Sequence, residues 1–429
     1  MKLTFLGHGY VGLVTATIFA DLGNTVYVIG HTKEKIDNLK KGILPIYEPG
    51  LQELVQKNIK AGRLIFTLDY KPAIPGSDVV FIAVGTPPKP SGEANLSTVF
   101  EVAKKIGENL SGYTVISVKS TVPIGTNRKV KEIINNAKAN KAEFDVASIP
   151  EFLREGSALQ DTLNPDRIVI GAESEKARQV IIDLHKSITA PLVLTNLETA
   201  EMIKYASNSF LATKISFSNA IAKLSEITGA DAIQVLDAIG LDKRIGKEFL
   251  QPGAGYGGSC FPKDVKALIS IAKSYNYKFS LLEEVENINK QARQDIVKKA
   301  TKLLDNPEGK IIGIFGLAFK SNTDDMREAP SIDIINALKE KGAKIKAYDP
   351  QSMNNAKGLI KDIEFCKNIY EVAKGADLLI VATDWNEFKE ADLVKIKNSM
   401  RTPLLIDGRN IYSPEKAKEI GFTYIGVGR

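Results

Sequence analysis

The feature that most constrains this fold is a glycine pattern near the start of the chain, Gly7-x-Gly9-x-x-Gly12. An apolar, strand-like run at residues 2–6 precedes the pattern, an apolar helical run follows it, and a second β-rich run occupies residues 25–29. Glycines between a strand and a helix let the backbone approach a pyrophosphate, and the free N–H groups of the helix start can bind it. The sequence therefore predicts a βαβ unit that binds a dinucleotide.

The position that normally contacts the adenosine ribose departs from this pattern. An acidic residue is expected roughly 20 residues after the glycines, but the chain has Gly30 there, followed by His31, Thr32 and Lys33. Without a carboxylate, this position neither hydrogen-bonds a 2′-hydroxyl nor repels a 2′-phosphate. We expect NAD as the cofactor. Two hypotheses remain: relaxed selection that also admits NADP, or NAD bound with one fewer hydrogen bond.

Strand-like and helical patterns alternate through the N-terminal part of the chain. Apolar β-rich runs lie at residues 79–84, 114–118 and 168–170, with helical patterns at residues 51–60 and 98–110 between them. Such alternation predicts a parallel, doubly wound sheet.

Near residue 199 the pattern changes to long helical periodicity without strands. One broad apolar stripe is formed by Ile203, Ala206, Phe210, Leu211, Ile215, Ile221 and Leu224. After a loop signal at residues 306–309, β-rich runs return at residues 311–315, 344–348, 378–382 and 404–406. The predicted fold class is α/β, with two Rossmann-like doubly wound domains at residues 1–198 and 307–429, joined by a helical central domain at residues 199–306.

The two α/β ends resemble each other in sequence. Residues 76–84 align with residues 375–383, and residues 2–7 resemble residues 310–316. Duplication of a nucleotide-binding unit is one explanation. The other is that any buried parallel strand has this composition.

Composition excludes several classes of protein. The chain has 429 residues, 44% of them hydrophobic and 25% charged, which is typical of a globular protein with more than one core. The net charge of +6 is spread over alternating lysines and acids, so no nucleic-acid partner is expected. No apolar run approaches the roughly 20 residues of a membrane span. We therefore expect a cytoplasmic protein without a membrane partner.

The cysteines and histidines are few. Two cysteines and three well-separated histidines give neither a disulfide framework nor a metal-binding spacing, so no metal is expected. Cys260 lies in a glycine-rich loop, and Pro262 suits the first turn of a following helix. A cysteine at a helix start beside Lys263 is stabilised as the reactive thiolate. Cys366 has no such surroundings and is expected to be structural.

Other candidate residues lie on a helix and in two loops. Asn196 could cap a helix on which Lys204 and Asn208 are four residues apart, although a lysine on a helix is often only a solvated side chain. Thr121 follows a strand directly, and Glu151 stands in a loop, where it could equally be a surface acid. Open α/β sheets bind ligands beyond the carboxyl ends of their strands, so these loops are expected at a ligand site.

Taken together, these motifs resemble the family of UDP-glucose and GDP-mannose dehydrogenases nearly from end to end. The motifs that carry the resemblance are Gly7-x-Gly9-Tyr10-Val11-Gly12-Leu13, Pro45-x-Tyr47-Glu48-Pro49-Gly50-Leu51, Gly85-Thr86-Pro87, Ser120-Thr121-Val122-Pro123 and residues 150–156, 257–264 and 316–330. The resemblance implies a four-electron oxidation of a nucleotide sugar, in which two NAD are reduced and Cys260 forms first a thiohemiacetal and then a thioester.

The resemblance also implies roles for further residues. Lys204 would stabilise the developing oxyanion, and Asp264 and Thr121 would position a water for proton transfer. Glu151 would assist thioester hydrolysis, and Asn208 would supply another hydrogen bond. The implied protein is a homodimer.

The binding residues follow from the same resemblance. The implied cofactor-binding positions are Gly7, Gly9, Tyr10, Val11, Gly12, Gly30, Lys35, Thr86, Thr121, Glu155, Lys263 and Arg327, with Gly30 as the position that has lost its acid. The implied substrate-binding residues are Glu151, Phe152, Leu153, Arg154, Glu155, Lys204, Asn208, Arg244, Phe249, Leu250, Gln251, Pro252, Gly253, Gly257, Lys320 and Arg409.

Within the family, residues 260–264 and 317–323 look most like the UDP-glucose branch. GDP-mannose and UDP-N-acetylhexosamines remain alternative substrates. Two other readings are a catalytically silent nucleotide-sugar-binding scaffold and a single-step hydroxyacid dehydrogenase. The presence of Cys260, Lys204 and Asp264 speaks against the scaffold, and Cys260 against the single-step enzyme. Besides Gly30, the chain departs from the family at Ile149, where an asparagine is usual and local hydrogen bonding could change.

Overall fold

The computed structural model describes residues 1–138 and 141–429. The chain forms two compact units, each described here by itself. The first unit is Met1–Ser207 with Lys266–Ser274, and the second is Asn208–Val265 with Tyr275–Arg429.

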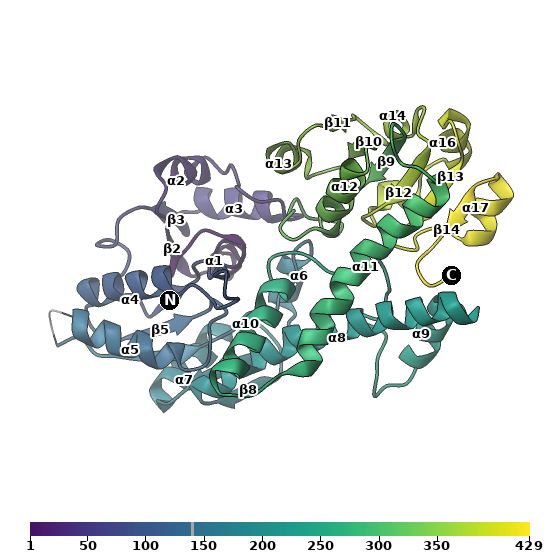
Figure 1. Ribbon diagram of the computed structural model, residues 1–429. Coiled ribbons are helices and arrows are strands. Elements are labelled where there is room, and N and C mark those ends of the chain that lie inside the picture. The colour runs from purple at the N-terminus through teal and green to yellow at the C-terminus, as the bar shows by residue number, and fades with distance from the viewer. Residues whose placement is uncertain (139–140) are drawn as a thin grey trace. The chain divides into compact units, whose positions relative to one another are not determined.

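The first unit contains an eight-stranded sheet in the order β3-β2-β1-β4-β5-β6-β7-β8. Its strands are β1 (Lys2–Leu6), β2 (Thr25–Ile29), β3 (Leu64–Thr67), β4 (Val79–Ile82), β5 (Thr114–Val118), β6 (Phe144–Ser148), β7 (Ile168–Ala172) and β8 (Leu192–Thr195). Its helices are α1 (Tyr10–Asp21), α2 (Lys33–Lys40), α3 (Leu51–Lys60), α4 (Ser97–Asn109), α5 (Thr126–Ala137), α6 (Ala158–Leu163) and α7 (Glu175–His185) (Figure 1). All pairs of strands are parallel except β6 with β7, where the sheet departs from the expected parallel arrangement.

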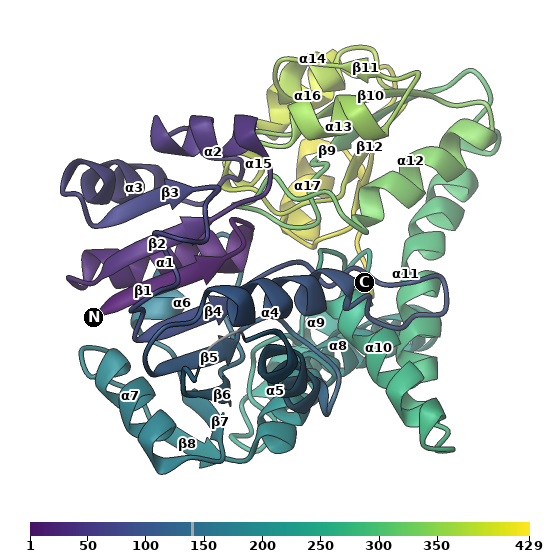
Figure 2. The same cartoon turned by 90° about the vertical axis from the view of Figure 1, so that its left-hand side faces the viewer.

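Helices cover both faces of this sheet because successive side chains of each buried strand point to opposite sides. Leu3 and Phe5 of β1 belong to a core that includes residues of α1 and α7. Leu6 belongs to a second core with residues of α4 and α5. Figure 2 shows α4 and α5 side by side on their face of the sheet, where they pack against each other.

The register brings the carboxyl ends of four strands to one edge. Leu6 is paired with Ile82, Ile82 with Val118, and Val118 with Ser148, each at or next to the end of its strand. The segments that follow these residues therefore meet at the same edge of the sheet. This is the edge at which open α/β sheets bind ligands.

The second unit repeats the topology in a six-stranded parallel sheet of order β11-β10-β9-β12-β13-β14. Its strands are β9 (Ile311–Phe315), β10 (Lys344–Tyr348), β11 (Glu364–Phe365), β12 (Leu378–Val381), β13 (Leu404–Asp407) and β14 (Thr423–Ile425). The helices around it are α12 (Pro330–Glu340), α13 (Met353–Leu359), α14 (Ile369–Ala373), α15 (Asn386–Lys389), α16 (Leu393–Ser399) and α17 (Pro414–Ile420). The same order is formed by the first six strands of the first unit. The predicted class, α/β with two Rossmann-like sheets, is confirmed.

The glycine turn of the second unit is closed by its own chain. The backbone N–H groups of Leu317 and Ala318 donate to Asp349 Oδ2 at 2.8 and 3.0 Å, and Trp385 Nε1 donates to the same oxygen at 3.2 Å. Asp349 follows β10, at the position that corresponds to Gly30 after β2. A side chain thus accepts hydrogen bonds from the N–H groups of this turn, and the next helix along the chain, α12, begins only at Pro330.

Four helices lie between the two sheets in sequence: α8 (Leu197–Thr228), α9 (Ala232–Gly240), α10 (Phe261–Ser274) and α11 (Ser280–Leu304). As predicted, no strand interrupts residues 199–306. Within the second unit, Ser216 of α8 donates to the carbonyl oxygen of Val285 in α11 at 2.8 Å. Part of the predicted apolar stripe is exposed, because Phe210 keeps 66% and Leu224 56% of its surface accessible.

Candidate active site

The glycine turn of the first unit is shaped for close backbone approach. Gly7 has a φ of 118°, and a Cβ there would strike the carbonyl oxygen of Ala83. A Cβ at Gly12 would strike the carbonyl oxygen of Gly7. At Gly9, by contrast, a Cβ would meet none of the described atoms within 4 Å. Two glycines therefore close the turn and the third leaves the start of α1 open, as a bound pyrophosphate requires.

Glu48 ties this turn to a distant loop. Its carboxylate accepts hydrogen bonds from the Tyr10 hydroxyl, from Gly156 N at 2.7 Å and from Ala158 N at 2.7 Å. The side chain is buried, with 5% of the residue exposed. We did not single out Glu48 from the sequence, although the Pro-x-Tyr-Glu-Pro-Gly motif was the available signal. It holds Tyr10 against the segment that follows Glu155.

A hydrogen bond between two threonines of the predicted site connects the loops that follow β4 and β5. Thr86 Oγ1 donates to the carbonyl oxygen of Thr121 at 3.0 Å, and Ser120 Oγ donates to that of Val84 at 2.7 Å. Both loops follow the carboxyl ends of parallel strands, as expected. The structure therefore brings Thr86 and Thr121 together at the ligand edge of the sheet.

Glu151 and Lys204 form a buried ion pair in the first unit. Lys204 Nζ lies 2.9 Å from Glu151 Oε1, and the two side chains are only 4% and 7% exposed. The other carboxylate oxygen accepts from Leu153 N at 2.8 Å. Burying both charges is costly unless they are paired and hydrogen-bonded, as they are here. The reading of both residues as ordinary surface groups is wrong for this structure.

Lys119 is a buried amine that we missed in the sequence. It follows β5 directly and is 7% exposed. Burial and the positive charge of Lys204 lower the pKa of Lys119 to about 8, although the carboxylate of Glu151 opposes this shift. A lysine just after a buried strand was the available signal. The first unit thus holds two lysines near one glutamate.

The remaining residues of the loop at 151–155 differ in exposure. Phe152 lies between two cations, with the Arg167 guanidinium 3.8 Å and Lys204 Nζ 5.3 Å from its ring centre. Leu153 is half-buried and Glu155 is buried. Arg154 is exposed, and its guanidinium donates to both oxygens of Asp161 at 2.9 and 2.7 Å. The Arg154–Asp161 ion pair connects this loop to the first turn of α6.

In the second unit, Cys260 stands at the predicted helix start. The N–H of Asp264 donates to the carbonyl oxygen of Cys260 at 2.8 Å, which makes Cys260 the residue before the first turn of α10, and Pro262 lies in that turn. Ser259 Oγ lies 3.5 Å from Cys260 Sγ. Cys260 is partly accessible, whereas Cys366 is buried. Burial and the nearby Glu364 raise the pKa of Cys366 to about 11.

Asp264 is the centre of a second buried group. Asn208 Nδ2 donates to Asp264 Oδ2 at 2.6 Å, and Lys263 Nζ pairs with Asp264 Oδ1. Asp264 is 1% exposed. The structure brings Asn208 and Asp264 together. Lys263, which we expected to support the thiolate of Cys260, has Asp264 as its ion-pair partner.

Backbone N–H groups of the cysteine loop are hydrogen-bonded to α8 and to the loop between β9 and α12. Gly253 N donates to Asn219 Oδ1 at 2.8 Å, and Gly258 N donates to the carbonyl oxygen of Arg327 at 2.8 Å. A Cβ at Gly257 would collide with the carbonyl oxygen of Glu328. Such close approach explains the glycines of this loop. Of its other predicted substrate residues, Leu250 and Pro252 are buried, Gln251 is exposed and Phe249 has a φ of 64°.

Arg409 is hydrogen-bonded to the backbone of the second unit. Its guanidinium donates to the carbonyl oxygens of Ala382 at 2.8 Å and Phe319 at 2.9 Å. Burial lowers the pKa of Arg409, and Asp384 opposes this effect. Lys320 Nζ lies 5.7 Å from the ring centre of Phe319. Arg409 and Lys320 therefore flank the same backbone segment.

Two predicted arginines are at the surface. The side chain of Arg244 is 88% exposed and donates to Asp242, and that of Arg327 is 62% exposed and donates to Asp325. In both cases the acid is two residues away, so a local turn sets the orientation of the arginine. Ile149, the second departure from the family pattern, is a core residue whose N–H donates to the carbonyl oxygen of Val118 at 3.2 Å.

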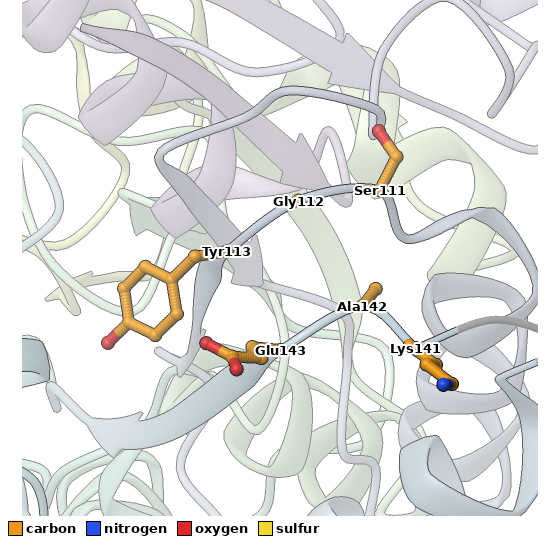
Figure 3. Close-up of a pocket in the computed structure, with 6 residues that line it drawn as sticks. All are labelled: Ser111, Gly112, Tyr113, Lys141, Ala142 and Glu143. Atoms are coloured by element: carbon orange, nitrogen blue, oxygen red, sulfur yellow. The ribbon is translucent and has the colours of Figure 1, made fainter.

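A shallow cavity of about 390 Å³ lies elsewhere in the first unit. Figure 3 shows its lining: Ser111, Gly112, Tyr113, Lys141, Ala142 and Glu143. These residues precede β5 and β6, so the cavity is at the amino ends of strands whose carboxyl ends carry Thr121 and Glu151. It contains none of the predicted site residues.

The described residues contain neither a cluster that could hold a metal ion nor a helix that could span a membrane. In residues 1–138 and 141–429, no group of three or more His, Cys, Asp and Glu side chains could hold a metal ion. No described helix is long and apolar enough to cross a membrane.

The open glycine turn of a Rossmann-type sheet, together with a cysteine at a helix start, defines a dinucleotide-dependent dehydrogenase. Comparison with known families makes this specific: residues 1–189 match the NAD binding domain of the UDP-glucose/GDP-mannose dehydrogenase family, residues 198–291 its central domain and residues 313–414 its UDP binding domain. The chain belongs to this family. It is an NAD-dependent dehydrogenase of nucleotide sugars.

Individual relatives agree with this assignment over their whole length. UDP-glucose 6-dehydrogenase TuaD of Bacillus subtilis is 49% identical over 429 residues, which cover 100% of this chain and 93% of the relative. A solved UDP-glucose dehydrogenase of Pyrobaculum islandicum is 38% identical, with a TM-score of 0.93 and coverage of 100% and 97%. A solved UDP-D-ManNAc dehydrogenase of Pyrococcus horikoshii is 29% identical, with a TM-score of 0.88 and coverage of 100% and 99%.

Proposed function

We propose that the protein is a UDP-glucose 6-dehydrogenase, which oxidises UDP-glucose to UDP-glucuronate and reduces two NAD for each sugar. The observation that carries the proposal is the helix-start position of Cys260, with Asp264 and Asn208 hydrogen-bonded to each other in the same unit. Relatives named UDP-glucose 6-dehydrogenase are 41–49% identical over this whole chain, which favours this sugar over the alternatives.

The glycine turn, with Tyr10 held by Glu48, suits the pyrophosphate of NAD. When bound, NAD accepts a hydride in each of the two oxidations. In the first, the C6 hydroxyl of the sugar also loses its proton to a water, which Asp264 and Thr121 position. Lys204 stabilises the oxyanion that develops on the sugar. The other binding residues named from the family resemblance remain part of this proposal.

Covalent capture then prevents loss of the aldehyde. The thiolate of Cys260 attacks the C6 carbonyl carbon, and the carbonyl oxygen takes up a proton to complete the thiohemiacetal. Loss of hydride and of that hydroxyl proton gives a thioester. Water, assisted by Glu151, adds to the thioester carbon, the C–S bond breaks, and carboxylate and free thiol are released. The buried pairing of Glu151 with Lys204 supports joint action of these two groups on the substrate.

We also propose three domains at residues 1–198, 199–306 and 307–429, and a homodimer formed through the central domain. The family domains at residues 198–291 and 313–414 support the division. Phe210, Phe217 and Leu224 of α8 support the dimer, because they recur at intervals of seven residues and are 66%, 48% and 56% exposed. An apolar row at this spacing is typical of helices that pack against a partner helix.

The proposed location is the cytoplasm. Cys260 must remain a thiol to act, and neither cysteine forms a disulfide. A reducing compartment keeps thiols in this state.

The test is a panel of nucleotide sugars assayed with NAD, in which reduced cofactor is counted for each sugar consumed. We expect UDP-glucose to have the highest kcat/KM, above UDP-N-acetylmannosamine and GDP-mannose, with two cofactors reduced for each sugar. A ratio of one would contradict the thioester route. A preference for another sugar would show that this sugar, and not UDP-glucose, is the substrate of the same reaction. Binding without turnover would support the alternative hypothesis of a catalytically silent scaffold.

A further inference from the structure

At the end of β2, a side chain at position 30 would have to displace the side chains that now lie against Gly30. A Cβ at Gly30 would lie 2.5 Å from Ile36 Cδ1 and 2.9 Å from His8 Nδ1. Both distances are too short for a real side chain, so Ile36 and His8 fill the space that a larger residue at position 30 would use. The side chains of Ile36 and His8 thus occupy the space next to Gly30 where the usual carboxylate side chain would begin.

His8 reaches this place from the glycine turn itself. It lies between Gly7 and Gly9, just after β1, and Leu6 of β1 is paired with Ile29 of β2. The turn after β1 and the end of β2 are therefore adjacent in the sheet. In this fold the adenosine ribose is bound where β2 ends.

The His8 ring is buried, and one of its nitrogens lacks a hydrogen-bond partner among the described residues. The residue is 6% exposed, and Nδ1 has no hydrogen-bond partner among the described residues. Buried polar nitrogens are nearly always hydrogen-bonded, so an open one beside a ligand site calls for an explanation. A neutral imidazole can donate or accept at this atom, depending on its tautomer.

The charged groups around His8 are mainly basic. The ring centre of His31 lies 5.3 Å from that of His8. Burial, followed by the charges of His31 and Lys35, lowers the pKa of His8 below its ordinary value. At neutral pH His8 is therefore uncharged. Glu34, in the same first turn of α2 as Lys35, is exposed.

We propose that His8 is the ribose-recognition residue of this enzyme, and that His31 and Lys35 let the same position accept a 2′-phosphate. His8 Nδ1 hydrogen-bonds a ribose hydroxyl of the adenosine, in place of the usual carboxylate. Because a neutral imidazole does not repel a phosphate as a carboxylate does, the site binds NADP in addition to NAD. This inference rests on cofactor binding at the glycine turn and not on the identity of the sugar.

Binding of NADH and NADPH to the full-length protein, measured by calorimetry without sugar, tests the inference. We expect His8→Ala to weaken NADH binding by about three- to tenfold, as for loss of one hydrogen bond. His8→Gln, which keeps a donor and an acceptor, should restore part of the affinity. The double variant H31A/K35A should weaken NADPH binding by about tenfold more than it weakens NADH binding. Lys40→Ala, at the other end of α2, is the matched control.

Two outcomes would overturn the inference. One is a His8→Ala protein whose unfolding temperature falls while its affinity for both cofactors stays unchanged, because His8 would then be only a packing residue. The other is an original protein that binds NADH at least a thousandfold more tightly than NADPH. Neither depends on sugar turnover, so failure of the UDP-glucose proposal would leave this experiment interpretable.

Discussion

The two cysteines show how position decides the chemistry of one residue type. Cys260 is partly accessible at the start of α10, whereas Cys366 lies in the second unit's core, where burial and Glu364 raise its pKa to about 11. A thiol held protonated is a poor nucleophile. The two residues therefore provide a matched comparison.

We predict that Cys260→Ser lowers the rate of carboxylate formation by about a thousandfold or more, because the attacking thiolate is lost. Cys366→Ser should cost about 1–2 kcal/mol of stability and leave kcat within about twofold. Steady-state assays with UDP-glucose and NAD, and urea unfolding, measure both effects. Normal turnover by the Cys260 variant would exclude the covalent route.

A second residue-scale prediction concerns His185, which is 7% exposed and donates from Nδ1 to the carbonyl oxygen of Ile181 at 2.8 Å. Burial, with a contribution from Lys119, lowers the pKa of His185 to about 4, although its hydrogen bond to Ile181 opposes the shift. The unfolded chain, with a pKa of about 6.5, binds the proton first. The contribution of His185 to the free energy of unfolding is therefore fully present above about pH 6.5. It is reduced by about 3 kcal/mol as the pH falls to about 4.

Urea unfolding across this pH range measures the effect. His185→Gln should flatten the slope between pH 6.5 and 4, and Ser187→Ala, at an exposed residue two positions further on, should not change it. An unchanged slope in the His185 variant would assign the acid sensitivity to other groups.

At the level of helices and strands, the sequence was informative where apolar runs were buried on both faces. The predicted runs at residues 2–6, 25–29, 114–118, 311–315 and 344–348 coincide with strands β1, β2, β5, β9 and β10. We did not predict the strands that are short, lie at the edges or mix polar residues: β3, β6, β8, β11 and β14. The antiparallel pairing of β6 with β7 was also missed, because apolar composition gives a strand's burial and not its direction.

The start of α8 gives an element-scale prediction. Asn196 Oδ1 accepts from Thr199 N at 2.8 Å, which confirms the predicted cap. Asn196→Ala should lower the free energy of unfolding by about 1 kcal/mol, because an N–H of the first turn loses its partner. Asn136→Ala, at an exposed position of α5, is the control and should be close to neutral. Equal stability of the two variants would show that the cap contributes nothing.

For the candidate site, the sequence identified residue types better than their partners. It pointed to Lys204, Glu151, Asn208 and Asp264, and the structure places them in two buried pairs. It did not reveal that Lys263 pairs with Asp264. Which acid a long side chain reaches depends on the rotamer and the local turn, and neither is encoded in residue spacing.

At the scale of the whole molecule, the exposed row on α8 gives a test of assembly. Phe210→Arg should convert the proposed dimer to a monomer, because a charge would replace an apolar contact at the proposed interface. Leu359→Arg, at a side chain of α13 that is 59% exposed, should leave the dimer intact. Sedimentation velocity distinguishes the two states. A dimer that survives the Phe210 change would place the interface elsewhere.

The position of the Asp349 carboxylate bears on the order in which cofactor molecules are used. Because this carboxylate accepts hydrogen bonds from the glycine turn of the second sheet, we expect each chain to have one dinucleotide site although it has two sheets of the same order. In the proposed reaction the two oxidant molecules would then be used in succession, with departure and rebinding in the middle of each cycle. During that exchange the proposed bond to Cys260 would hold the half-oxidised sugar until the second molecule arrives.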